Sequence, residues 1–328
     1  MAETTTSSAP GDGAASKPPG SESLLTVIIA LGANTLIAVA KTVVAAITGS
    51  ASMVAEAAHS WSDAGNEVFL LVAERRAAKP ADDSHPLGHG REAYVWSMFA
   101  AFGLFTAGAI VSIWHGVSSW NAPHGEEVDY TWAYAVLALA FVLESVSFLQ
   151  ARRQTRAAAR AAGLHPLRFL ARTSNPTLRA VYAEDAAALL GILIAATGIV
   201  LHQVTGNARW DAAGSVLVGI LLGCVAVFLI SRNRDFLVGQ AASPALRANG
   251  LRSLRADPEV ERVTFLHLEF VGPGKVFLVA AVDLIGDSPE TATSRRLRAV
   301  TARLEEHENI ERAVLTLSVP EDETLVPG

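Results

Sequence analysis

Six apolar runs, each long enough to cross a lipid bilayer, constrain the fold of this chain more than any other feature. A membrane-spanning helix takes about 20 mostly apolar residues. Because lipid offers the backbone no hydrogen-bond partners, each run can satisfy its own amides and carbonyls only as an α-helix. A wholly soluble helical protein is the alternative, and six runs of this length argue against it. The runs are Leu24–Thr48, Ala51–Ala73, Tyr94–Val117, Trp132–Leu149, Ala180–Val204 and Ala212–Ile230.

The composition supports the same class of protein. The 328 residues are 51% hydrophobic and 18% charged, with a mean hydropathy of +0.32, which is typical of an integral membrane protein. We therefore predict an α-helical membrane protein with six transmembrane helices. No block of basic residues accompanies the net charge of −6, so nucleic acid is not an expected partner. Because Cys224 is the single cysteine, metal ligands within the chain would be histidines and carboxylates.

The second run carries His59 and Asp63 near its middle. Their i, i+4 spacing places both on one helix face. Ionisable groups at membrane depth cost several kcal/mol unless they face a partner, a cavity or an ion, and a histidine with a carboxylate offers two ligands to a divalent transition metal. A polar pair buried for packing is the alternative. Glu56 and Glu67 lie one turn on either side, as cation way-stations or as polar lining.

The fifth run contains the adjacent carboxylates Glu184 and Asp185. Neighbouring positions on a helix diverge by about 100°, so both can aim at one point only if the helix rotates or tilts. We expect one of them to face His59 and Asp63. The other would pair with Arg179 or look toward the cytoplasmic opening. The alternative is that both lie at the cytoplasmic interface of the membrane.

The charges of the loops predict an orientation. Basic residues collect on the cytoplasmic side of membranes. The uncharged turn between the first two runs and the acidic loop after the third run are therefore expected to face outward. Both termini are then expected to be cytoplasmic. The loop after the third run holds Glu126, Glu127 and Asp129 and no basic residue. The basic residues after the second, fourth and sixth runs are Arg75, Arg76, Lys79, Arg91, Arg152, Arg153, Arg156, Arg160, Arg168, Arg172, Arg179, Arg232 and Arg234.

The sequence of the last quarter of the chain predicts a soluble domain. Pro near a helix start, strand-like alternation of apolar and polar residues, and a Gly-Pro-Gly turn predict the order αββαβ, a two-layer α+β domain of the ferredoxin or metallochaperone type. Its predicted elements are Pro244–Arg255, Val260–Phe270, Lys275–Ile285, Ser288–His307 and Ile310–Val319. The domain prediction is a disordered tail at 1–22, a transporter domain at 23–234, a cytoplasmic domain at 235–320 and a tail at 321–328.

Several motifs, in this order, resemble the cation diffusion facilitator family of proton-coupled zinc and manganese exporters. They are His59-Ser-Trp-Ser-Asp63, the run Ser84-His-Pro-Leu-Gly-His-Gly90 with its continuation to Trp96, Asp185, Asp211 and the αββαβ tail. The resemblance covers about Leu24 to Val319. The histidine-glycine run and the Glu184-Asp185 pair resemble one branch of the family, which includes a vertebrate mitochondrial zinc transporter.

The resemblance implies a function and a site. The family's transport site is tetrahedral, with two ligands from the second span and two from the fifth, each pair at i, i+4. His59, Asp63 and Asp185 match it, whereas the fourth position falls at Val181, which cannot bind metal, and Glu184 is the nearest substitute. The implied cargo is Zn²⁺, with Mn²⁺, Fe²⁺ and Co²⁺ left open, and protons are the counter-ion. The tail implies a homodimer that meets in the cytoplasm.

Two rival functions stay open. An intramembrane metallohydrolase would need an open metal position beside a general base, and Glu184 is the residue that fits that role, but no protease motif such as His-Glu-x-x-His is present. A non-transporting metal sensor or partner protein on the same fold is the second rival, kept open by the missing ligand at Val181. We therefore expect a transporter rather than an enzyme.

Other polar residues have plainer interpretations. Asn34 and Asn66 are expected to form interhelical hydrogen bonds. Lys41 is expected to extend toward the outer interface, and Glu144 to pack near the cytoplasmic end of the fourth span.

Histidines outside the spans include His85 and His89, in a loop that binds zinc in some members of the family, and His267 and His307 in the tail. For the loop pair we favour a capping or packing role. The tail holds too few ligands to predict a binuclear metal site.

Overall fold

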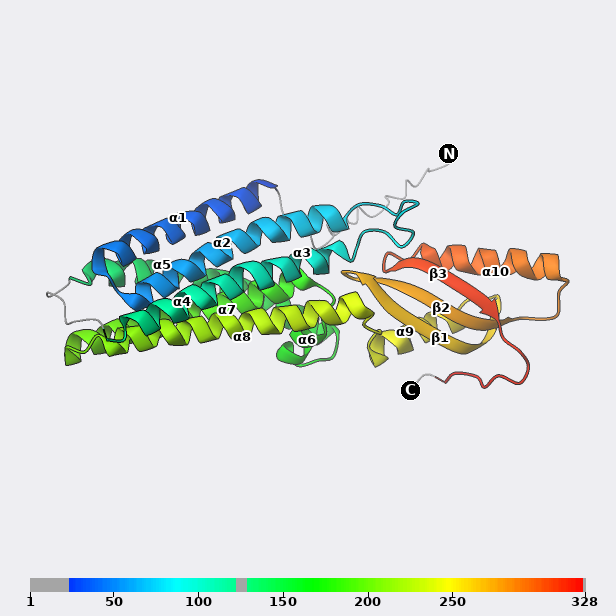
Figure 1. The fold of residues 1–328 in the computed structure, drawn as a ribbon. Coiled ribbons are helices and arrows are strands. Elements are labelled where there is room, and N and C mark those ends of the chain that lie inside the picture. Colours follow the sequence, from blue (N-terminus) through cyan, green and yellow to red (C-terminus); the bar gives the residue numbers. More distant parts are fainter. Residues whose placement is uncertain (1–23, 122–128, 327–328) are drawn as a thin grey trace, which may run out of the picture.

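The computed structural model describes residues 24–121 and 129–326. The predicted tail at 1–22 and most of the acidic outer loop lie outside the described residues. A bundle of long helices and a small α+β domain lie end to end (Figure 1). The helices of the bundle are α1 (Leu24–Thr48), α2 (Ala51–Ala77), α3 (Glu92–Ala100), the π-helical turn η1 (Ala101–Phe105), α4 (Thr106–Ser119), α5 (Thr131–Ala161), α6 (Pro166–Arg172), α7 (Pro176–Thr205) and α8 (Arg209–Val238).

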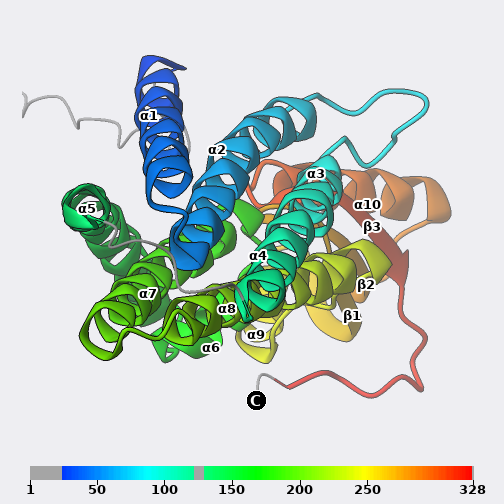
Figure 2. The same ribbon diagram turned by 60° about the vertical axis from the view of Figure 1, so that its left-hand side comes forward.

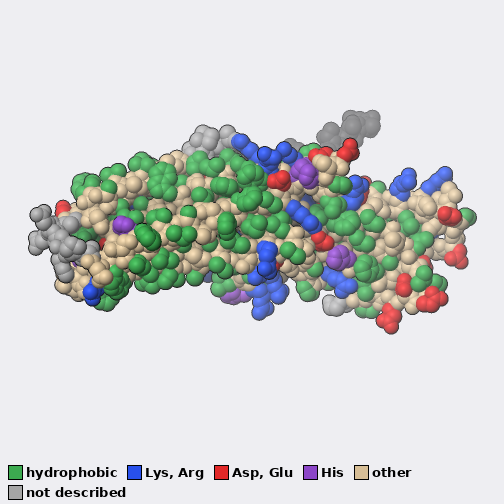
Figure 3. All heavy atoms as spheres, in the orientation of Figure 1, with side chains coloured by type: hydrophobic (Ala, Val, Ile, Leu, Met, Phe, Trp, Pro, Cys, Tyr) green, Lys and Arg blue, Asp and Glu red, His purple; other side chains and the backbone are tan. Residues whose placement is uncertain are grey.

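Five helices of the described chain are long and apolar enough to cross a membrane: α1, the continuous α3–η1–α4 rod, α5, α7 and α8. The sixth long helix, α2, has the length but carries too many ionisable residues to meet the same criterion. It nevertheless packs along α1, α4, α7 and α8, and Figure 2 shows it between α1 and the rod of α3 and α4. The outer surface of the bundle is a band of apolar side chains (Figure 3) that includes Leu36, Trp114 and Leu139, as a lipid-facing surface requires.

The helices α5, α7 and α8 extend beyond the predicted spans. An apolar run marks only the part of a helix that matches lipid, and the backbone continues as helix into the polar region. For α5 this continuation carries Arg152, Arg153, Arg156 and Arg160. In Figure 3, basic side chains gather where the bundle meets the α+β domain.

The π-helical turn η1 interrupts the third spanning rod, a feature that the apolar pattern did not reveal. Such a turn frees a carbonyl from the regular helical ladder and is often found at functional sites. Here the hydroxyl of Ser62 on α2 donates to the carbonyl oxygen of Leu104 at 3.1 Å. The irregular turn is thus held against α2 at the residue next to Asp63.

The N-terminus of α2 is held by a residue far away in the sequence. Asp211, in the first turn of α8, accepts hydrogen bonds from the Ser50 hydroxyl at 2.8 Å and from the amides of Ala51 at 2.6 Å and Ser52 at 3.1 Å. These donors belong to the helix start, where backbone N–H groups lack helical partners and a negative charge is favoured. Asp211 therefore fixes α2 lengthwise against α8.

The predicted αββαβ order is confirmed. The elements are α9 (Pro244–Arg255), β1 (Val260–Gly272), β2 (Lys275–Leu284), α10 (Glu290–Glu305) and β3 (Ile310–Leu317). The sheet order is β1-β2-β3, with β1 and β2 antiparallel and β2 and β3 parallel. The parallel pair follows from the crossover through α10. Leucine and valine side chains from both helices and the inner sheet face, including Leu254, Leu278 and Val300, form its core.

The α+β domain meets the bundle through the tip of its β1–β2 hairpin. A Cβ atom on Gly90 would lie 2.7 Å from the carbonyl oxygen of Val271, so the two backbones approach as closely as glycine allows. Beside them Arg91 pairs with Glu269 at 2.5 Å. Phe236, near the end of α8, stacks on Tyr94.

Candidate functional site

His59 and Asp63 lie together on α2, buried in the bundle. The His59 Nε2 atom is 3.6 Å from the Asp63 Oδ1 atom, and the two side chains are 1% and 14% exposed. Both atoms are buried without a hydrogen-bond partner, as are Glu56 Oε1 and Glu67 Oε2. Buried polar atoms are normally satisfied, so a row of four such atoms along one helix indicates a place for an ion or protons.

The carboxylates of α7 approach this row and then diverge, as the helical geometry predicted. Glu184 accepts a hydrogen bond from the Asn66 side-chain amide of α2 at 2.5 Å. Asp185 accepts from the Ser147 hydroxyl of α5 at 2.8 Å. Both carboxylates are buried. Glu184 thus turns toward α2 at Asn66, and Asp185 turns toward α5 at Ser147; that one of them faces His59 and Asp63 stays a prediction.

The alternative pairing with Arg179 is wrong. Arg179 is itself buried and donates to the carbonyl oxygens of Leu170 and Thr173 and to the Asn233 side chain. It therefore anchors the start of α7 to α6 and α8 rather than neutralising the acidic pair.

The four predicted ligands share one electrostatic environment but do not form a closed set. Asp63 interacts electrostatically with Glu184 and Asp185. In the described chain, however, the only group of three or more His, Cys, Asp or Glu side chains with ligand atoms within 4.8 Å of one another lies elsewhere, in a loop. The described structure therefore does not bring His59, Asp63, Asp185 and Glu184 together as one ligand set.

Val181 occupies the position where the motif lacks a ligand. It is partly buried and packs against an apolar cluster that includes Leu70, Phe105 and Leu222. This cluster lies on the side of α7 that faces α2, α8 and the π-helical turn. At this position the chain therefore uses apolar packing between helices.

Lys41 and Glu144 also belong to this region, and the sequence-based prediction for Lys41 was wrong. Lys41 was expected to reach the outer interface, yet its Nζ atom lies 2.8 Å from Glu56 Oε2 and the side chain is 1% exposed. Glu144, on α5, interacts electrostatically with Asp63, Glu67 and Asp185. Its i, i+3 spacing to Ser147 is the signal that could have placed it on the face of α5 that meets the site.

The two asparagines behave as predicted. Asn66 bonds to Glu184, and the Asn34 side-chain amide of α1 donates to Glu67 at 2.5 Å. The Glu67 end of the carboxylate row of α2 is thus tied to α1 by Asn34 and to α7 by Asn66.

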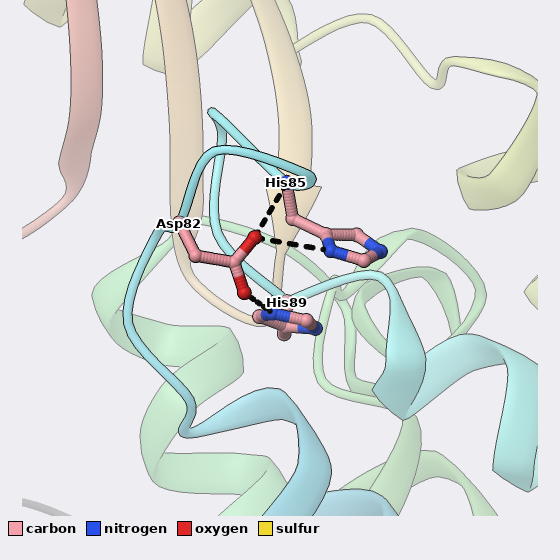
Figure 4. A group of neighbouring side chains, drawn as sticks. All are labelled: Asp82, His85 and His89. Carbon is pink, nitrogen blue, oxygen red and sulfur yellow. Dashed lines mark hydrogen bonds and ion pairs between the residues drawn. The ribbon is translucent and has the colours of Figure 1, made fainter.

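A second cluster lies in the loop between α2 and α3, where Asp82 is joined by His85 and His89 (Figure 4). The Asp82 carboxylate lies 3.4 Å from His85 Nδ1 and 3.0 Å from His89 Nε2. The Ser84 hydroxyl, and then His89 and the amide of His85, hold the pKa of Asp82 well below its usual range. These three side chains offer two nitrogens and a carboxylate to one ion, which suits zinc. The sequence interpretation missed Asp82, although the spacing Asp-x-x-His-x-x-x-His was available.

In the tail domain, the side chain of His267 lies near the carboxylate of Glu269. Its Nε2 atom lies 3.8 Å from Glu269 Oε2. His267 and His307 belong to no three-residue ligand group within the described chain.

Comparison with known proteins places the chain in a family. The model of the cation efflux transmembrane domain matches residues 27–238. The human protein named proton-coupled zinc antiporter SLC30A9, mitochondrial, is 37% identical over 239 residues, which are 73% of this chain and 42% of that protein. Metal tolerance protein C4 of Arabidopsis thaliana is 34% identical over 71% of this chain and 51% of its own length.

A bacterial relative aligns over nearly its full length. The metal cation efflux system protein CzcD of Cupriavidus metallidurans is 25% identical over 286 residues, covering 87% of this chain and 84% of that protein. The matches to the human and plant proteins are higher in identity, but the chain spans about half or less of their length. The family match extends over α1 to α8 and includes every residue of the intramembrane site. This chain belongs to the cation efflux family.

Proposed function

We propose that this protein exports a divalent metal ion, Zn²⁺ in the first place, in exchange for protons. The observation that carries the proposal is the buried row of unpartnered His59 Nε2 and Asp63 Oδ1 atoms on α2, with two buried carboxylates of α7 beside it. Nitrogen and carboxylate oxygen are ligands that zinc accepts. The names of the human and bacterial relatives, a zinc antiporter and a metal efflux protein, support the same reading.

In this proposal the cargo binds between α2 and α7. His59 and Asp63 supply two ligands, Asp185 supplies a third, and Glu184 substitutes for the ligand that Val181 cannot provide. Binding to a metal requires a neutral imidazole and ionised carboxylates, so metal uptake releases protons from these groups. Protons that reload the same groups from the other side then expel the metal. A carboxylate-rich set discriminates weakly, which keeps Mn²⁺, Fe²⁺ and Co²⁺ as alternative cargoes.

The membrane arrangement is also part of the proposal. We infer that α2 crosses the membrane as the sixth span, shielded from lipid by its neighbours in the bundle. Basic side chains near the α+β domain support a cytoplasmic location for that domain. To test the orientation, single cysteines replace Asn121 and Val326 in a Cys224→Ala background. They should react with an impermeant label from opposite sides of the membrane.

A homodimer is the proposed assembly. The outward face of the small sheet carries exposed apolar side chains, and Phe265 and Val314 on this face are 52% and 43% exposed. A second copy of the domain would remove this surface from water. A monomeric mass in mild detergent, under conditions that preserve metal flux, would contradict this assembly.

Flux through purified protein in liposomes tests the main proposal. Zinc movement coupled to proton movement, abolished in Asp63→Asn and retained in the outer-loop control Asp129→Asn, is the expected result. Zinc binding without movement would favour the sensor alternative instead. Peptide hydrolysis without zinc movement would favour the hydrolase.

A further inference from the structure

A buried ion pair lies on the outer side of the proposed metal site. Lys41 Nζ on α1 and Glu56 Oε2 on α2 are 2.8 Å apart, and the side chains are 1% and 0% exposed. Taking two charges out of water costs several kcal/mol per ion, and replacing such a pair with apolar residues is often neutral or stabilising. Stability alone therefore does not explain why this pair stands inside the bundle.

Glu56 has a second oxygen that the ion pair leaves free. Glu56 Oε1 is buried and has no hydrogen-bond partner. It lies 2.5 Å from the point that a Cβ atom on Gly191 would occupy, and His59 Nδ1 lies 3.4 Å from the same point. The absent side chain at Gly191 thus creates the space into which the free oxygen of Glu56 and one nitrogen of His59 both point.

The two ring nitrogens of His59 consequently have different neighbours. Nε2 faces Asp63 Oδ1 at 3.6 Å, on the side of the proposed metal site. Nδ1 faces the Gly191 gap that also holds Glu56 Oε1. Glu56 and Lys41 both interact electrostatically with His59, so the residues form a row from α1 through α2 to the metal site: Lys41, Glu56, His59 and Asp63.

Metal-binding histidines need a partner for their second ring nitrogen. A histidine that binds metal through one nitrogen donates the N–H of the other to a carboxylate, carbonyl or water, which fixes the tautomer and the ring orientation. A free carboxylate oxygen beside Nδ1 suits that task. The pairing with Lys41 keeps this carboxylate in place, because one oxygen is bound and the other remains available.

We propose that Glu56, anchored by Lys41, is a positioning residue that accepts the Nδ1 proton of His59 and so presents Nε2 to the transported metal. This inference rests on the proposed metal site between α2 and α7. In it Glu56 is not itself a ligand, because its free oxygen lies on the far side of the imidazole ring from Asp63. The pair makes the affinity of the site depend on a contact between α1 and α2.

The test is a double-mutant cycle on metal affinity, measured by calorimetry on the full-length protein in detergent. The histidines of the loop cluster are first removed by His85→Ala and His89→Ala, so that the heat reports the intramembrane site. Removal of a carboxylate that orients a metal-bound histidine typically lowers metal affinity about 10–100-fold. We expect Glu56→Gln to weaken Zn²⁺ binding by such a factor, and the same change to have no further effect in a His59→Asn background. Lys41→Met should reproduce the loss in the parent background.

The matched control is Glu67→Gln, a partly buried carboxylate one turn from Asp63 that accepts a hydrogen bond from Asn34. In the same cycle, the effects of Glu67→Gln and His59→Asn on Zn²⁺ affinity should simply add. Co²⁺ provides a second readout, because its visible absorption reports the coordination geometry: Glu56→Gln should alter the spectrum, whereas Glu56→Asp should keep the parent bands. Glu56→Gln is nearly isosteric, so the test does not depend on whether Lys41→Met folds.

Two results overturn the inference. One is parental affinity for Glu56→Gln while Asp63→Asn loses binding. The other is a loss for Glu56→Gln that adds fully to that of His59→Asn. If instead Asp63→Asn binds Zn²⁺ like the parent protein, the proposed site itself fails, an outcome that is distinct from failure of the positioning role.

Discussion

Replacing Asp211 should loosen the end of the bundle that lies away from the α+β domain, because this carboxylate of α8 caps the start of α2. The side chain is 4% exposed and accepts from the Ser50 hydroxyl and the amides of Ala51 and Ser52. Asp211→Ala leaves all three donors without this acceptor. At about 1–3 kcal/mol for each buried unsatisfied donor, the upper limit of the loss is about 9 kcal/mol.

The lower limit comes from interhelical hydrogen bonds in membranes, which average about 0.6 kcal/mol each, so three of them contribute about 2 kcal/mol. We expect a loss of about 3 kcal/mol, near this lower limit, because water reaches the ends of membrane helices and replaces part of the lost bonding. Asp211→Asn keeps one acceptor oxygen but loses the charge at the N-terminus of α2, and should cost about 1–2 kcal/mol.

The assay is unfolding in mixed detergent micelles, followed by circular dichroism of the purified protein. Asp129→Asn is the control, since it removes a charge on the same side of the bundle from an exposed residue that caps only its own helix start, at Thr131. It should unfold like the parent protein. Equal midpoints for Asp211→Ala and the parent would refute the argument that Asp211 fixes α2 against α8.

Three further predictions concern the site and the tail domain. If Glu184 replaces the ligand missing at Val181, Glu184→Gln and Asp185→Asn should weaken Zn²⁺ binding to a similar degree in calorimetry; parental affinity for Glu184→Gln alone would count against Glu184 as a ligand, and Val181→His should then tighten binding. Gly191→Ala should reduce Zn²⁺ affinity, because its Cβ would lie 2.5 Å from Glu56 Oε1, whereas Gly223→Ala meets only an ordinary contact at 3.9 Å and should be neutral; equal affinities for the two variants would contradict the close packing at Gly191. Hydrogen bonds from Arg303 lower the pKa of Asp257, so the stability that this pair contributes is present above the ordinary carboxyl pKa of about 4 and fades as the pH falls below it; thermal unfolding should show this decline in the parent protein, and Asp257→Asn should reduce it.

The sequence alone determined the features that depend on local periodicity. Long apolar runs can only be helices in lipid, and the order of helices and strands in the tail followed from alternation and turn residues. The i, i+4 spacing placed His59 and Asp63 on one face. The adjacent positions of Glu184 and Asp185 predicted that their carboxylates diverge, and they do, toward Asn66 and Ser147.

Helix boundaries and irregularities were less accessible. The ends of α5 and α8 lie in polar sequence where apolarity gives no signal. The π-helical turn depends on a partner for its free carbonyl, and that partner, Ser62, comes from another helix.

Only the tertiary structure decided which distant residues meet inside the bundle. Lys41 was expected to reach outward but pairs with Glu56, and Glu144 turns toward the acidic site from α5. Asp82 joins His85 and His89 because of how a loop folds. Each of these outcomes depends on the rotation of a helix about its axis or on the path of a loop. Those are set by the packing of neighbours, such as the close approach at Gly191 and the cap at Asp211, and local sequence does not encode them.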